Sequence, residues 1–263
     1  MIKLKLYFSF ILLMMASSLT LGAAISNESL DKVMKMSGLT QQIAETPAAI
    51  IGGLAQARAQ GTPVSDDVFT ALSDTVNNTF HPTKIEDAVK QSLKSALTEE
   101  DAKKLFSWYD TALGKKITDA EVKATSPEAM QSMMQQAQQL MSNQERVQIA
   151  LEMLNQMKVL DKTLASQEAT AVAVYAAMSS ALAPDQPVNT EAYRQQFSSQ
   201  LSAMKPQLEQ MIVLGLVYTY QDFSVADIKK YIEFNKTPAA SKLNQTSING
   251  MNTAISSAAN SFN

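Results

Sequence analysis

Few side chains in this sequence could do chemistry, and the first of them is a single histidine. His81 precedes Pro82, and the chain contains no cysteine. A zinc site or a nucleophilic triad needs histidine or cysteine at fixed spacing from its partners, and those partners are missing. The glycine-rich runs that cradle phosphates are also missing. We therefore predict no catalytic residues, no metal site and no cofactor, and we place His81 at a turn.

Carboxylates are the next candidates, and Glu99-Glu100-Asp101 is their densest group. Paired carboxylates can act as general acid and base. These three follow Thr98, which has the properties of a helix N-cap, and negative charge is favourable in the first turn of a helix. We interpret the group as helix-stabilising. An envelope hydrolase that uses carboxylate, tyrosine and lysine, with Glu99 and Tyr109 as first candidates, is the alternative.

Methionine is the remaining candidate ligand, because 12 of the 15 methionines follow Ala24. Met130, Met133, Met134 and Met141 fall on one face of a predicted helix. Thioethers can bind Cu(I), but methionine is also an adaptable filler of cores and interfaces. We predict a core or interface role and keep methionine-based copper binding as a second alternative.

The N-terminus has the pattern of a secretory signal. Lys3 and Lys5 precede an apolar stretch from Leu6 to Met15, and Gly22-Ala23-Ala24 supplies small residues for a peptidase site. We predict a signal peptide over residues 1–24 with cleavage after Ala24, and a periplasmic or secreted protein. A retained N-terminal anchor is the alternative. No later run is long enough to predict a transmembrane span.

Composition favours helices and excludes some partners. The chain has 22 basic and 25 acidic residues, and it loses two lysines with the signal. Nucleic-acid binding requires clustered lysine and arginine, so we predict no nucleic-acid partner. Abundant Ala, Gln, Met, Ser and Leu, with only 6% aromatic residues, predict an all-α fold.

Cap residues mark the starts of several predicted helices. Thr46-Pro47 and Ser126-Pro127 each offer a cap followed by proline at the first helical position. Thr83 and Glu86 have the spacing of a capping box. Each pair predicts a new helix at that point.

Two segments of the chain have similar sequences. Residues 97–117 align without a gap onto residues 223–243, at a constant offset of 126. This match predicts an internal duplication in a helical bundle of two homologous multi-helix units. We place the first unit at residues 25–125, a connecting helix at 126–142 and the second unit at 143–263.

The repeated segment has a physical interpretation. Thr98 and Ser224 are predicted N-caps, and Thr111 and Thr237 restart a helix in each copy. A small residue follows three positions after each restart, which suggests a close approach between helices. These small residues are Gly114 and Ala240.

This motif resembles that of the bacterial domain-of-unknown-function family 2059, a Phe-Tyr-x-Ser-Pro-x-Gly-x-Lys run. The first copy matches it at Trp108-Tyr109, Thr111, Gly114 and Lys116, and has Ala112 in place of proline. The second copy matches it at Phe234, Thr237-Pro238 and Lys242, and has Asn235 in place of tyrosine and Ala240 in place of glycine. The resemblance implies an exported helical protein and no established activity. We select Trp108, Tyr109 and Phe234 as binding candidates.

The C-terminal segment has no charged residue after Lys242. A helical seam is predicted there, formed by Ile248, Met251, Ile255, Ala258 and Phe262. Such a helix depends on docking, either onto the first unit of the same chain or onto another protein.

These features together predict a non-catalytic binding or interaction protein of the bacterial envelope. Its partner would be a protein or a hydrophobic segment, held in grooves between helices that are rich in Met, Ala and Gln.

Overall fold

The computed structural model describes residues 23–59, 61, 64–182 and 187–261. These residues confirm the all-α class, since they form helices and a single isolated bridge between Ala24 and Thr98. The helices are α1 (Asn27–Met36), α2 (Leu39–Ala59), α3 (Asp66–Thr79), α4 (Pro82–Ala96), α5 (Glu99–Tyr109), α6 (Ala112–Ala124), α7 (Pro127–Ser142), α8 (Gln144–Gln156), α9 (Val159–Leu182), α10 (Thr190–Thr219), α11 (Val225–Lys236) and α12 (Pro238–Asn260).

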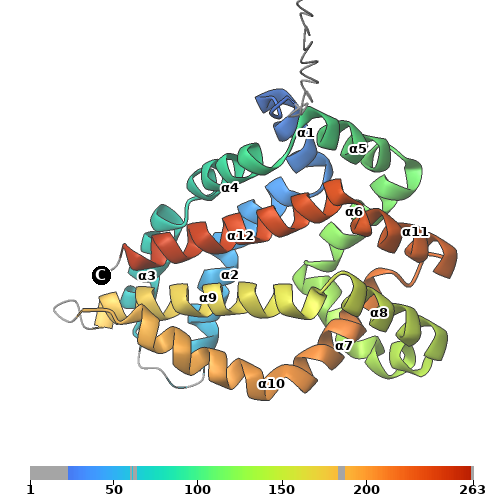
Figure 1. The fold of residues 1–263 in the computed structure, drawn as a ribbon. Helices are drawn as coiled ribbons and strands as arrows, with labels where there is room; N and C mark the ends of the chain where they lie inside the picture. The colour runs from blue at the N-terminus through green and yellow to red at the C-terminus, as the bar shows by residue number, and fades with distance from the viewer. Residues whose placement is uncertain (1–22, 60, 62–63, 183–186, 262–263) are drawn as a thin grey trace, which may run out of the picture.

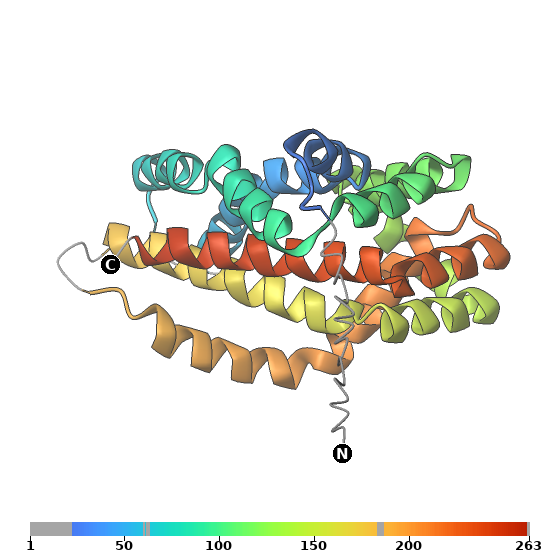
Figure 2. The ribbon, with the colours of Figure 1, turned by 45° about the horizontal axis from the view of Figure 1, so that its top comes forward.

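The long helix α12 runs through the middle of the molecule (Figure 1). It packs against α4 on one side and α9 on the other, and its first turns meet α5. α2 crosses behind and contacts both α4 and α9. Figure 2 shows α10 bowing away from α9 along the outer edge. Pro206 lies inside α10, where it removes one backbone hydrogen bond and favours such a bend.

Two apolar clusters hold these helices together. The larger one extends from α1 through α12 and includes Phe80, Leu93, Leu105 and Ile232. The smaller one joins α7, α8 and the C-terminal part of α10, through residues Met133, Leu140, Ala150, Leu154, Val213, Leu214 and Val217. α8 lies between the two clusters, because its residues contribute to both.

Most of the predicted caps are confirmed, and two are wrong. The side chains of Thr98, Ser224, Thr111, Thr237 and Ser126 each accept a backbone N–H at the start of their helices, and Thr98 forms a full capping box with Asp101.

Pro47 lies inside α2, where the hydroxyl of Thr46 donates to the carbonyl of Gln42 instead of capping a new helix. The helix predicted to begin at Thr83 begins earlier, because His81 is the N-cap and Pro82 occupies the first position. Both corrections concern a proline whose place in the helix the sequence leaves ambiguous.

The C-terminal helix docks on its own chain. Ile255 is buried, Ile248, Met251 and Ala258 are half-buried, and Phe262 lies outside the described residues. Gly250 permits the approach to α4, since a Cβ atom there would lie 3.3 Å from the Cα of Val89. Of the two predicted partners, α12 therefore packs on its own chain, against α4 and also against α9.

Three other predictions concern the chain's organisation. Of the signal peptide predicted at residues 1–24, residues 1–22 lie outside the described part of the structure. α7 covers the segment expected to connect the two units. Among the described residues, no helix combines the length and apolar character needed to cross a bilayer.

Candidate functional site

The three binding candidates meet in a single aromatic cluster where α5 contacts α11. The rings of Trp108 and Phe234 stack with centroids 4.6 Å apart, and Tyr109 packs edge-on against Phe234 at 5.5 Å. Tyr231 stacks with Trp108, at a centroid distance of 5.9 Å, and with Phe234, at 6.4 Å. Tyr109 is only 8% exposed, and burial raises the pKa of its hydroxyl. Trp108 thus packs between α5 and α11, while binding by these residues stays a prediction.

Trp108 and Phe234 occupy equivalent positions in the two aligned segments, and the lysines of those segments are also reciprocal. Lys242 pairs with Asp101 at the start of α5, with Nζ and Oδ2 2.9 Å apart. Lys116 lies over the ring of Phe223, 4.6 Å from its centroid, and donates to the carbonyl of Asp222 just before α11. Each lysine therefore reaches the N-terminal end of the helix in the other segment.

The half-buried residue Glu121 lies beside this cluster. The hydroxyls of Tyr220 and Tyr231 both donate to Oε1 of Glu121, at 2.5 and 2.6 Å. Burial raises the pKa of Glu121, and the two tyrosine hydrogen bonds oppose that rise. The carboxyl joins α6 to the end of α10 and to α11. Its position relative to Gly114 and Ile117 on the buried face of α6 is the sequence signal that could have revealed it.

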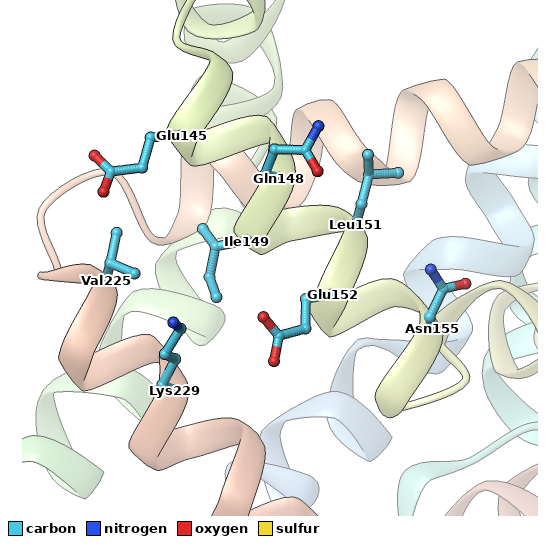
Figure 3. A pocket seen from close by; sticks show the side chains of 8 residues that line it. All are labelled: Glu145, Gln148, Ile149, Leu151, Glu152, Asn155, Val225 and Lys229. Atoms are coloured by element: carbon cyan, nitrogen blue, oxygen red, sulfur yellow. The ribbon is translucent and has the colours of Figure 1, made fainter.

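An open hollow of about 570 Å³ lies between α8 and α11 (Figure 3). We call it the α8 groove, and it is lined by Glu145, Gln148, Ile149, Leu151, Glu152, Asn155, Val225 and Lys229. Ile149 is buried at its floor, whereas the carboxylates of Glu145 and Glu152 are exposed. Glu152 and Lys229 extend toward each other from opposite helices in Figure 3. Within the described part of the chain, neither carboxylate takes part in an ion pair.

The apolar surface of this groove continues across α8. Leu151 also lines a second hollow of about 300 Å³ between α7, α8 and α10, together with Met141, Val147, Pro206, Glu209, Gln210 and Val213. Leu151 is half-buried and forms the ridge between the two hollows. The shared ridge makes one band of apolar side chains with acidic residues on both sides. This band has the chemistry of a surface for an elongated ligand.

Comparison with known proteins adds one family. Residues 83–143 match a family described as an uncharacterized protein conserved in bacteria (DUF2059). Over that stretch, the chain is similar to DUF2059. No curated protein and no solved structure matches the chain.

The DUF2059 match runs from α4 into α7 and includes Trp108 and Glu121. It contains the first of the two aligned segments, and the second lies outside it. The tandem second copy and the export of the chain stay predictions.

The methionines predicted to share one face of α7 differ in their exposure to solvent. Met133 is buried in the smaller apolar cluster, whereas Met130 and Met134 are 55% and 52% exposed. Core packing is thus confirmed for Met133. The two exposed thioethers lie on the solvent side of α7, away from the side that Met133 buries.

The other polar candidates lie at the ends of helices α4 and α5. His81 is exposed and caps α4, as its predicted turn position implies. Glu99 and Tyr109, the first candidates for a hydrolase, lie at opposite ends of α5 and do not converge. Among the residues that the structure describes, no three His, Cys, Asp or Glu side chains are grouped so that they could hold a metal ion.

Proposed function

We propose that this chain is a non-catalytic protein of the bacterial envelope that binds a segment of another protein in the α8 groove. The observation that carries the proposal is the combination of an apolar floor at Ile149 and a half-buried apolar ridge at Leu151 with the exposed carboxylates of Glu145 and Glu152. A partner segment would cover apolar surface that the fold leaves accessible.

Charge complementarity defines the partner. Among the described residues that line the groove and the adjoining hollow, Glu145, Glu152 and Glu209 carry carboxylates and Lys229 carries a positive charge. A segment with apolar residues along one face and lysine or arginine beside them fits this pattern. Apolar contacts would supply most of the affinity, and the acidic residues would steer and orient the encounter.

The envelope location is supported by the N-terminal sequence. Lys3 and Lys5, the apolar stretch after them and Gly22-Ala23-Ala24 form the arrangement that export machinery recognises. We propose that the mature chain begins at Ile25 and works in the periplasm or outside the cell.

We also propose that the two aligned segments descend from an internal duplication. The support is the constant offset of 126 and the same order of capped helices in both copies. Contacts between the copies are reciprocal, with Trp108 stacked on Phe234 and with Lys116 and Lys242 each reaching the other segment. Reciprocal contacts of this kind are typical of a two-fold interface between identical units.

The binding proposal is tested by photo-crosslinking in intact cells. A photoreactive amino acid replaces Gln148 in the groove, and crosslinked segments are identified by mass spectrometry. We expect one recurrent segment of basic, amphipathic sequence. A synthetic peptide of that sequence should bind the purified protein with an affinity that falls as salt rises.

A charge-reversal pair provides the control for this experiment. Glu145→Lys with Glu152→Lys should abolish the crosslink, whereas Asp67→Lys on α3, at the other end of the molecule (Figure 1), should leave it intact. Circular dichroism checks that the variants keep their helix content. A crosslink that survives the double reversal, or a recurrent segment that is acidic, would refute the proposal.

Two alternative functions have separate tests. A hydrolase acting through Glu99 or Tyr109 predicts that alanine at either position fails to complement a knockout phenotype while helix content stays unchanged. Copper binding through exposed Met130 and Met134 predicts copper in protein purified without chelators, and its loss in the Met130→Leu/Met134→Leu variant.

A further inference from the structure

The segment before α1 is fixed against the beginning of α5. The backbone N–H of Ile25 donates to the carbonyl of Leu97 at 3.3 Å, and the side chain of Ile25 is only 2% exposed. One residue earlier, Ala24 forms the isolated bridge with Thr98. The backbone around Ile25 therefore has a defined position in the fold.

The carboxylate of Glu99 faces this segment. Its Oε1 accepts the backbone N–H of Ser26 at 2.5 Å, and its Oε2 accepts the hydroxyl of Ser29 at 2.9 Å. Both serines lower the pKa of Glu99, so the group carries its negative charge at neutral pH. Consecutive backbone nitrogens are less than about 4 Å apart, which places the nitrogen of Ile25 within about 6.5 Å of Oε1. Opposite charges at that distance interact appreciably.

We propose that cleavage after Ala24 creates an α-ammonium group on Ile25 that pairs with Glu99 and fastens α1 onto α5. Water adds across the Ala24–Ile25 peptide bond, which leaves a carboxylate on Ala24 and an amine on Ile25 that takes up a proton. This inference rests on the export part of the proposed function. It assigns Glu99 a specific ligand, the new amino terminus of its own chain.

Cleavage exchanges one set of hydrogen bonds for another. The bond from the N–H of Glu99 to the carbonyl of Ala23 is lost, and the freed N–H lies at the first turn of α5, where water can reach it. The ammonium group can keep the bond to Leu97 and gains two further donors and a positive charge. The uncleaved chain has a neutral amide at the same place, so the ion pair forms only in the processed protein.

The first test determines the amino terminus. The full chain is expressed with its native N-terminus, and protein from the periplasmic fraction is analysed by N-terminal sequencing and intact mass. We expect the chain to begin at Ile25. A different first residue in exported protein, or a chain that is not exported, overturns the inference.

The second test isolates the ion pair and does not depend on export. Protein beginning at Ile25 is prepared with a free α-amino group and with the same group acetylated, in the natural sequence and in Glu99→Gln. Acetylation should raise the unfolding equilibrium constant about threefold in the natural sequence and leave it unchanged in Glu99→Gln.

Glu100→Gln is the matched control, because Glu100 is adjacent but pairs with Lys104. That variant should keep the full effect of acetylation. An equal effect in Glu99→Gln and in the natural sequence would refute the ion pair while leaving the proposed envelope location intact.

Discussion

Replacement of Glu121 by glutamine should change how stability depends on pH. The side-chain amide keeps an oxygen where Oε1 accepts the hydroxyls of Tyr220 and Tyr231, at 2.5 and 2.6 Å. The substitution therefore preserves both hydrogen bonds and the shape of the side chain. It removes only the group whose pKa burial raises.

The direction of the effect follows from proton linkage. The pKa of Glu121 is raised above its ordinary value of 4.5, so between that value and the folded-state pKa the folded protein holds a proton that the unfolded chain releases. The free energy of unfolding thus falls as pH rises through this interval. Each unit of elevation corresponds to about 1.4 kcal/mol. Glutamine has no such proton, so the variant gains stability relative to the natural protein as pH rises and then levels off.

Urea denaturation at intervals between pH 4 and pH 8 measures this difference. The tyrosines provide the accompanying variants. Tyr220→Phe or Tyr231→Phe removes one donor and should cost about 1.5–3 kcal/mol when Glu121 is ionised, because a charged acceptor loses a partner. The same substitutions should cost less in the Glu121→Gln background. A stability difference between glutamine and glutamate that is flat over the whole range would refute the reasoning.

Three further predictions concern residues around this cluster, and the first has a control substitution elsewhere. Gly114→Ala would place a Cβ 2.3 Å from the carbonyl oxygen of Trp108 and should cost about 1–3 kcal/mol in chemical denaturation, whereas Gly52→Ala, with no atom within 4 Å, should be neutral or stabilising. Trp108→Ala should cost about 3–5 kcal/mol by the same measurement, since it removes the ring stacked on α11. Burial raises the pKa of Asp101, but the hydrogen bonds that Asp101 accepts from Lys242 and Thr98 have the larger effect, so its pKa is lowered. Lys242→Met removes one of these bonds and should raise the pKa of Asp101 in an NMR titration.

Local chemistry was sufficient to predict where five of the described helices begin, namely α5, α6, α7, α11 and α12. Thr98 and Ser224 cap their helices because a hydroxyl at that position satisfies a backbone N–H that has no partner within the helix. Prolines were harder to interpret. A proline can start a helix or lie within one, and the choice at Pro47 depends on the packing of α2 against α4 and α9, which no local pattern contains.

The sites themselves depended on contacts that are distant in sequence. Glu121 meets Tyr220 and Tyr231 across 99 and 110 residues, and the α8 groove forms only where α11 lies beside α8. The stacking of Trp108 on Phe234 could be anticipated only in part, because the alignment of the two segments marks equivalent residues without stating that they touch.

The proposed duplication has a bearing on the hydrogen bonds of Glu121, which are present in only one of the two copies. Residue 121 corresponds at the offset of 126 to Ser247, a buried residue on α12 whose hydroxyl has no hydrogen-bond partner in the described structure. Both tyrosines that hold Glu121 lie within residues 143–263, the range of the proposed second unit, and among the described residues no reciprocal hydrogen bond is made by the side chain of Ser247. Around the Trp108–Phe234 stack the arrangement is reciprocal, and at residues 121 and 247 it is not. Under the proposed duplication, the two copies keep reciprocal contacts around the Trp108–Phe234 stack and differ at residues 121 and 247, which is where we expect functional differences between them to reside.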